Sequence, residues 1–268
     1  MVSTIEKYIT SLKLQIKENI TGSKEFDIDS IHDFRVGLKK TRTMLNLIHF
    51  WVYQNSDRTA IYRQIRPIFK KTGKIRELQV HEELLPEISE QTGLNLEFLS
   101  KKISYHVNRN KAPLAKDLKN FEKAYPRIFK NIDKQLKKSE TLRKRTDAPR
   151  GYQVRLEKRI QKQLRSSSPN LHLIRSLIKQ KVYIFDAFQE SELLSFYKEF
   201  RAEWKILESS MGKWHDQLCF MEWLSKGLKW KRLSDEQYKT MLNLIAWLKS
   251  STDRMEEQLI QSVPRLNV

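Results

Sequence analysis

Hydrophobic residues recur at helical spacing along most of this chain, as at Ile5, Ile9, Leu12 and Ile16. Spacings of three and four residues place side chains on one face of a helix, which can then pack against a core. The seven glycines and seven prolines fall mostly between these periodic runs. The pattern therefore predicts an all-α protein. The helices are expected at about residues 3–20, 30–54, 57–71, 74–90, 94–110, 115–142, 152–165, 170–189, 191–208, 211–229 and 234–261.

The helix expected over residues 30–54 carries an unusual row of nitrogen-bearing side chains. The row consists of His32, Arg35, Lys39 and Arg42. At 100° per residue these side chains fall within an arc of about 80°. An apolar stripe that includes Phe34 and Leu38 runs directly beside them, whereas a solvated charged face would lie opposite the stripe. The row is therefore expected to line a cleft or a bundle seam and to hold oxyanions, although such side chains can also lie at a core edge with their charges in water.

The same row returns later in the chain. His172, Arg175 and Lys179 follow His32, Arg35 and Lys39 at an offset of 140 residues. A second pair of segments, beginning at Gly73 and Gly212, aligns at an offset of 139 residues. Two matches at almost the same offset indicate a tandem duplication, which constrains the fold.

These residues resemble the CHAD family, the conserved histidine α-helical domain, whose halves each carry a His-x-x-Arg helix and a later Gly-x-x-Arg-Asp type segment. The resemblance spans nearly the whole chain. It implies two four-helix bundles about a pseudo-twofold axis, so that both rows would face a shared basic central channel. We expect one CHAD-like domain over residues 1–268, with a first repeat at 1–112 and a second at 113–268 that includes basic connecting helices.

The second half departs from the family pattern. Gln180 and Val182 stand where basic residues would usually follow Lys179, and Lys181 is the only nearby replacement. Glu77 stands at the usual Asp of the first later segment, and His215 stands at the usual Arg of the second. A weaker second half-site is the expectation.

The net charge of +19, from 51 basic and 32 acidic residues, favours a polyanionic partner. Residues 134–165 hold twelve Lys or Arg against three acidic residues, and Arg155, Arg159 and Lys162 share a helical face there. That face is either solvated or an extension of the channel wall. Single-stranded nucleic acid would call for aromatic stacking platforms, which both rows lack, and no helix combines a basic face with exposed Trp and Phe as a membrane surface would require.

A polyphosphate chain needs only closely spaced guanidinium, ammonium and imidazole donors. The resemblance points to the same guest, since CHAD domains are implicated in binding inorganic polyphosphate and in association with polyphosphate granules. Arginines are expected to make bidentate contacts, lysines to supply less directional charge, and His32 and His172 to donate one ring nitrogen. The expected binding residues are His32, Arg35, Lys39, Lys40, Arg42, Arg76, Arg155, Arg159, Lys162, His172, Arg175, Lys179, Lys181 and Tyr183.

We expect a binding module and no enzyme, with no cofactor and no metal site. The alternative is a phosphate-processing or metal-chelating enzyme that uses the histidines, but the rows lack interleaved carboxylates and the chain has no GxxxxGK phosphate loop. A second alternative is a basic helical protein that binds nucleic acid. Cys219, the single cysteine, is expected to be buried, and the six tryptophans lie in apolar runs typical of a core. The N-terminus has no signal-peptide pattern, so a cytoplasmic protein, at polyphosphate granules if the resemblance holds, is expected.

Overall fold

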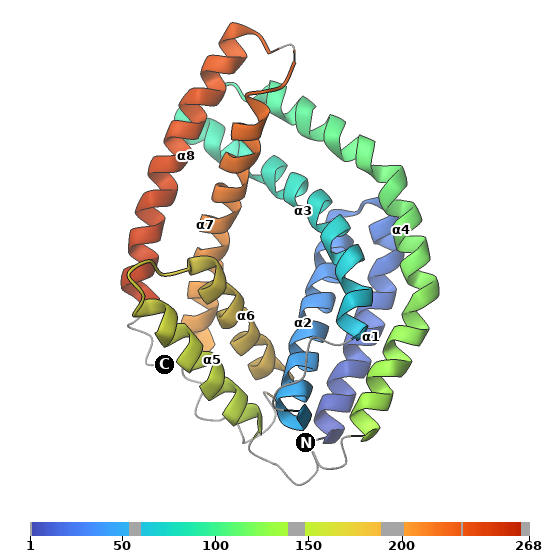
Figure 1. Ribbon diagram of the computed structural model, residues 1–268. Coiled ribbons are helices and arrows are strands. Elements are labelled where there is room, and N and C mark those ends of the chain that lie inside the picture. The colour runs from blue at the N-terminus through green and yellow to red at the C-terminus, as the bar shows by residue number, and fades with distance from the viewer. Residues whose placement is uncertain (1, 54–59, 139–147, 189–200, 232, 264–268) are drawn as a thin grey trace.

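The structure, a computed structural model, describes residues 2–53, 60–138, 148–188, 201–231 and 233–263. The described residues form eight helices and no strand, which confirms the all-α prediction (Figure 1). Parts of the expected helices 30–54, 57–71, 115–142, 170–189 and 191–208 lie outside the described residues. The helices are α1 (Val2–Glu25), α2 (Ile28–Tyr53), α3 (Ala60–Thr92), α4 (Glu97–Lys138), α5 (Ala148–Leu164), α6 (Leu171–Ala187), α7 (Arg201–Gly227) and α8 (Asp235–Ser262).

Three of the expected helix breaks are wrong. Helix α3 runs without interruption through Gly73, α4 through Pro113, and α7 through Ser209 and Ser210, between the expected helices 191–208 and 211–229. A glycine inside a helix costs about 1 kcal/mol relative to alanine, and tertiary packing on both sides of it can outweigh that cost. Proline has no backbone N–H, so one carbonyl oxygen of the preceding turn lacks its helical hydrogen bond. Pro113 is exposed on α4, so this unpaired acceptor is not buried in the core.

The two helices that carry the His-x-x-Arg rows begin at capped ends. The side chain of Asp27 accepts a hydrogen bond from the amide of Ser30 at 2.8 Å at the start of α2. The side chain of Asn170 accepts a hydrogen bond from the amide of Leu173 at 2.8 Å and caps the start of α6. Each cap satisfies an amide that the first helical turn leaves unpaired.

Two buried hydrophobic clusters hold the helices together. The larger draws side chains from all eight helices, including the expected α1 stripe of Ile5, Ile9, Leu12 and Ile16. The smaller is formed by one end each of α3, α4, α7 and α8, the helices that meet at the top of Figure 1. Helix α3 passes from the larger cluster at Ile75 to the smaller at Leu78.

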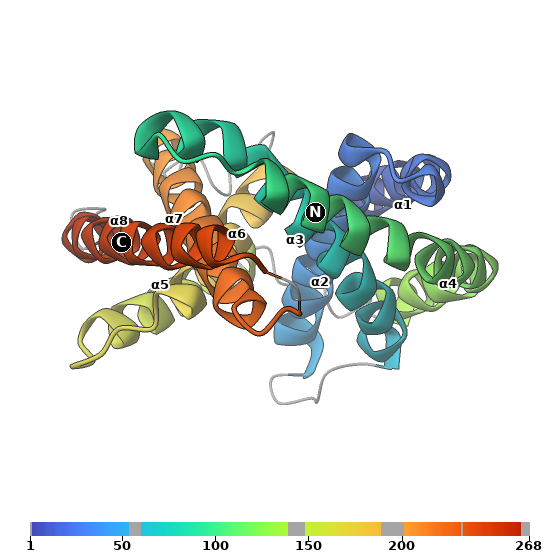
Figure 2. The same cartoon turned by 90° about the horizontal axis from the view of Figure 1, so that it is seen from above.

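The chain order divides the helices into two sets of four, α1–α4 and α5–α8, and Figure 2 shows these sets on opposite sides of the molecule. Helix α2 contacts α6, and α3 contacts α7. The boundary expected between residues 112 and 113 falls inside α4, and α5 begins at Ala148. Among the described residues, none of the helices combines the length and the hydrophobicity needed to cross a membrane.

Candidate functional site

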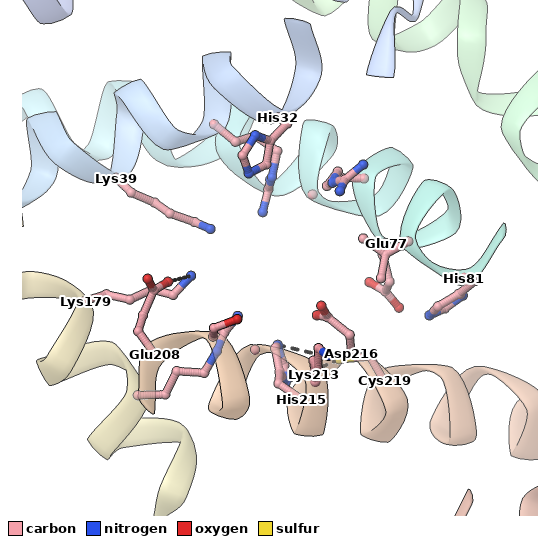
Figure 3. A pocket seen from close by; sticks show the side chains of 17 residues that line it. His32, Lys39, Glu77, His81, Lys179, Glu208, Lys213, His215, Asp216 and Cys219 are labelled. Atoms are coloured by element: carbon pink, nitrogen blue, oxygen red, sulfur yellow. Dashed lines mark hydrogen bonds and ion pairs between the residues drawn. The ribbon is translucent and has the colours of Figure 1, made fainter. Parts of the chain in front are cut away.

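A cavity of about 410 Å³ lies between the two sets of helices, where α2 and α3 face α6 and α7 (Figure 3). Residues of both rows line it: Arg35 and Lys39 from the first row, and Arg175 and Lys179 from the second. The expectation that the two rows share one cavity is met for these four residues. The full lining consists of His32, Arg35, Lys39, Gly73, Arg76, Glu77, Val80, His81, Arg175, Lys179, Glu208, Ser209, Gly212, Lys213, His215, Asp216 and Cys219.

Arg35, from the first row, is anchored to the backbone of α3. Its Nη1 donates to the carbonyl oxygen of Phe69 at 2.6 Å and to Oγ1 of Thr72 at 3.3 Å. The guanidinium also lies 4.4 Å from the centre of the Phe69 ring. Burial and the neighbouring Arg76 lower the pKa of Arg35 to about 10. One edge of this cation is thus committed to holding α2 against α3.

Arg175, the corresponding residue of the second row, is less committed. Its Nε is buried and has no hydrogen-bond partner among the described residues. A buried donor without a partner costs about 1–3 kcal/mol, and an anion bound in the cavity would recover part of that cost. The ring of His172 lies 4.3 Å from that of His215, centre to centre, at the edge of the same site.

The two lysines of the rows crowd the same space. Burial and the nearby charges of Lys179, Arg35 and Arg175 hold the pKa of Lys39 well below its ordinary value. No ion pair involves Lys39 in the part of the chain that the structure describes. Lys179 has a lowered pKa as well, from burial and Arg175, although its Nζ lies 3.0 Å from Oε1 of Glu208. This end of the cavity carries positive charge that its own carboxylates do not balance.

The opposite end holds two carboxyl groups and two histidines. Burial raises the pKa values of Glu77 and Asp216, which Figure 3 shows on facing helices α3 and α7. Burial and the nearby Arg175 lower the pKa of His215 to about 3, and burial alone lowers that of His81 to about 4. No three His, Cys, Asp or Glu side chains in the described ranges are grouped so that they could hold a metal ion.

Several of the expected binding residues lie away from the cavity lining. Lys40 stacks over the ring of Tyr183 at 5.9 Å, and Arg42 lies 6.0 Å from the ring of Tyr62. His172 is exposed and reaches the lining only through His215. Arg155, Arg159 and Lys162 are exposed on α5, and none of them lines the cavity.

Lys181 occupies the core instead of the cavity. Only 1% of its side chain is exposed, and its Nζ lies 2.8 Å from Oε1 of Glu157 and 4.1 Å from the centre of the Trp204 ring. The neighbouring Gln180, which stands where the family pattern has a basic residue, accepts hydrogen bonds from Asn46 at 3.3 Å and Tyr152 at 3.0 Å. Both positions therefore stabilise the packing of α2, α5 and α6.

Arg76 lines the cavity as expected, but it forms a two-pronged ion pair with Glu83 at 2.8 and 3.1 Å. Cys219 is only partly buried and lines the cavity, so the expectation that it is buried is wrong. Four further residues line the cavity although none of them is among the expected binding residues: His81, Lys213, His215 and Asp216. The aligned segments that begin at Gly73 and Gly212 could have indicated most of them, since both segments face the site.

The CHAD domain family matches residues 9–225 of this chain. The fold is similar to the CHAD domain from the plant Ricinus communis, with a TM-score of 0.72 and 16% identity over 97% of this chain and 91% of that one. It is also similar to PptA from Streptomyces chartreusis, with a TM-score of 0.69 and 11% identity over 98% of both chains. No curated protein matches the sequence. Because the family match covers most of its length, the chain belongs to the CHAD domain family.

Proposed function

We propose that the protein binds inorganic polyphosphate in the cavity between α2, α3, α6 and α7, without catalysing a reaction on it. The observation that carries this proposal is the convergence of Arg35, Lys39, Arg175 and Lys179 from both halves on one cavity. The CHAD family is associated with polyphosphate binding in general, which supports the same guest.

The electrostatics of the cavity favour an anion. Four cations within one cavity repel each other, and the lowered pKa values of Lys39 and Lys179 are the signature of that repulsion together with burial. A phosphate chain would offset both effects, since its oxygens accept hydrogen bonds and its negative charge stabilises the protonated lysines. Arg175 lines the cavity and forms no ion pair or side-chain hydrogen bond within the described ranges, so its guanidinium has no competing partner there.

The lining favours a phosphate chain over a nucleic acid. Its aromatic members are the histidines alone, and no Phe, Tyr or Trp lines this cavity. Binding of single strands gains about 1–3 kcal/mol per base from aromatic stacking, and this lining provides no such stacking partner among the described residues. A chain of phosphates without bases uses all that the cavity presents.

The two halves contribute unequally to this proposal. Arg35 gives one edge of its guanidinium to Phe69 and Thr72, whereas Arg175 forms no ion pair or side-chain hydrogen bond within the described ranges. The second row was expected to be the weaker one because it has fewer cations. We infer that it supplies the more available arginine, while the first row supplies the unpaired Lys39.

One binding experiment tests the proposal. Long-chain polyphosphate, orthophosphate and single-stranded RNA are titrated at two salt concentrations into the native protein, Arg175→Ala and Arg159→Ala. We expect polyphosphate to bind most tightly, with a steep salt dependence from counterion release, and Arg175→Ala to weaken it at least tenfold. Arg159→Ala, on the exposed face of α5, is the matched control and is expected to change little.

Equal affinity for RNA, or equal loss in both arginine variants, would contradict polyphosphate binding at this cavity. Release of orthophosphate from the polymer over time would contradict a purely binding role. In cells, a fluorescent fusion of the protein is expected to collect at polyphosphate granules, and Arg175→Ala is expected to disperse it.

A further inference from the structure

The outer face of α4 carries a row of cations that lies outside the cavity lining. Seven of its basic side chains fall within an arc of about 80° at 100° per residue and extend over about 37 Å of the helix. All seven are exposed. We call this set the α4 stripe: Arg109, Lys116, Lys119, Lys123, Arg127, Lys130 and Lys134.

The packing of α4 directs the stripe to solvent. The buried face of the helix includes Leu114, Leu118, Tyr125 and Ile128, which belong to the larger hydrophobic cluster. The centre of this buried face lies about 170° around the helix from the centre of the stripe. Figure 1 shows α4 along the outer edge of the first set of helices, so nothing in the described chain covers its outward face.

Two carboxylates in the part of α4 that carries the stripe form ion pairs with other helices. Asp117 pairs with Lys71 of α3 at 2.5 Å, and Glu122 pairs with Lys24 of α1 at 3.0 Å. In contrast, no ion pair within the described ranges includes a member of the stripe. These two acids therefore bind α4 to α1 and α3, and the seven cations of the stripe have no ion-pair partners within the described ranges. Such an arrangement attracts a polyanion more strongly than the same charges interspersed with carboxylates.

We propose that the α4 stripe is a second binding surface for polyphosphate, on which a segment of a long chain lies along the helix. The proposal rests on the proposed function for the identity of the guest. A flexible phosphate chain can follow the stripe along α4, including the bend of this helix that Figure 1 shows. A duplex is stiff and its phosphates follow a helical path, so it matches a bent row of cations on one helix less closely.

Other polyanionic partners fit the stripe less well. Tyr105, one turn before Arg109 and 60% exposed, is the exposed aromatic side chain of α4 that lies in line with the stripe. It offers a platform for one base, whereas binding of a single strand along the helix would use a series of such platforms. The other large hydrophobic side chains that the structure describes on α4 pack in the two hydrophobic clusters, so they are not free to enter a membrane. A polymer with one negative charge on each repeat and no other chemical feature matches what the stripe presents.

Two separate surfaces for one polymer make binding depend on chain length. A short oligophosphate can occupy the cavity alone, whereas a long chain can engage the cavity and the stripe together. The second contact is then intramolecular and increases the overall affinity by about 100-fold or more. The same two surfaces can also hold segments of different chains, so that the protein crosslinks polyphosphate.

The test compares tripolyphosphate with long-chain polyphosphate. The stripe variant combines Lys116→Gln, Lys119→Gln, Lys123→Gln and Arg127→Gln. Its charge-matched control removes four exposed lysines outside the stripe. The control combines Lys229→Gln, Lys231→Gln, Lys239→Gln and Lys249→Gln.

We expect the stripe variant to bind tripolyphosphate as the native protein does and to bind the long chain at least tenfold more weakly. Losing four phosphate contacts lowers the magnitude of the log–log salt slope by about 3. Light scattering from mixtures with the long chain is expected to fall in the stripe variant and to persist in the control.

Equal behaviour of the stripe variant and its control with the long chain would overturn the proposal. So would competition in which duplex DNA displaces the long chain from the stripe at equal phosphate concentration. If Arg175→Ala leaves tripolyphosphate binding unchanged while the stripe variant still loses the long chain, the cavity proposal fails and the stripe proposal stands.

Discussion

Gly73 lies directly against the guanidinium of Arg35. A Cβ atom added at Gly73 would lie 2.8 Å from Nη1 of Arg35, closer than such atoms approach each other in proteins. The corresponding glycine of the second half, Gly212, has more space, since a Cβ there would lie 4.0 Å from Nη2 of Arg175. The same glycine thus faces the same arginine in both halves, but only the first pair is in tight contact.

The two glycines allow a matched pair of substitutions. Gly212→Ala is expected to raise the free energy of unfolding by about 1 kcal/mol through helix propensity and to leave polyphosphate affinity unchanged. Gly73→Ala is expected to displace Arg35 from Phe69, so that it gains little stability and weakens polyphosphate binding severalfold. Urea denaturation and titration with polyphosphate measure both effects. Identical results for the two variants would show that the contact at Gly73 has no role.

Polyphosphate binding is expected to take up protons through Lys39. The pKa of Lys39 lies well below 10.5 in the free protein, and a bound phosphate raises it. Affinity should therefore fall as the pH rises through this lowered pKa. The stability of the free protein changes in the opposite direction, because the charge that burial and neighbouring cations disfavour is removed as the pH rises towards 10.5.

Calorimetry in two buffers of different ionisation enthalpy measures this proton uptake. The control is Lys39→Arg, whose guanidinium keeps its charge across the same range and should flatten the pH dependence. A native protein that binds with the same affinity and no proton uptake across the alkaline range would contradict the prediction.

His81 is expected to make the fold sensitive to acid. Its ring is fully buried, and neither ring nitrogen has a hydrogen-bond partner among the described residues. Burial lowers its pKa from 6.5 to about 4, so the unfolded chain binds a proton between these values and the folded chain does not. Stability is therefore complete above pH 6.5 and is lost as the pH falls, by about 3 kcal/mol at pH 4.

The variant His81→Phe removes this titration and keeps an aromatic ring beside Phe220 and Trp223, whose ring centres lie 5.0 and 5.4 Å from that of His81. Urea denaturation at pH 7.5 and at pH 5 should show a smaller difference for this variant than for the native protein. The control His32→Gln alters a half-exposed ring and should keep the native difference. An unchanged pH slope in His81→Phe would assign the acid sensitivity to other groups.

Lys181→Ala is expected to affect stability and not binding. Removing this lysine leaves the carboxylate of Glu157, only 16% exposed, without its cation, at a cost of about 3 kcal/mol. The double variant Lys181→Met with Glu157→Gln should recover much of this loss. Urea denaturation measures the stability, and polyphosphate titration of the folded variant measures the affinity. A loss of polyphosphate affinity at unchanged stability would contradict this prediction and show that Lys181 contributes to binding.

The helical spacing in the sequence predicted the all-α fold and the duplicated rows, and the family resemblance implied that both rows face one channel. The spacing did not predict that α3 continues through Gly73, because this glycine was taken as a helix break where it instead makes room for Arg35. The burial of Lys181 could have been predicted, since it is about 200° around the helix from Lys179. The placement of Asp216 and Lys213 depends on the contact between α3 and α7, which no local pattern encodes.

Helix α3 contributes to both hydrophobic clusters, and Gly73, Arg76, Glu77 and Val80 line the cavity near the point where it passes from one to the other. Moving this wall of the cavity would disturb two cores at once. The cations are therefore held in place before any guest arrives, and the loss of conformational freedom on binding falls on the polymer. A cyclic guest such as trimetaphosphate is more rigid than linear tripolyphosphate and loses less conformational freedom on binding. Comparing the binding entropies of the two would measure this contribution.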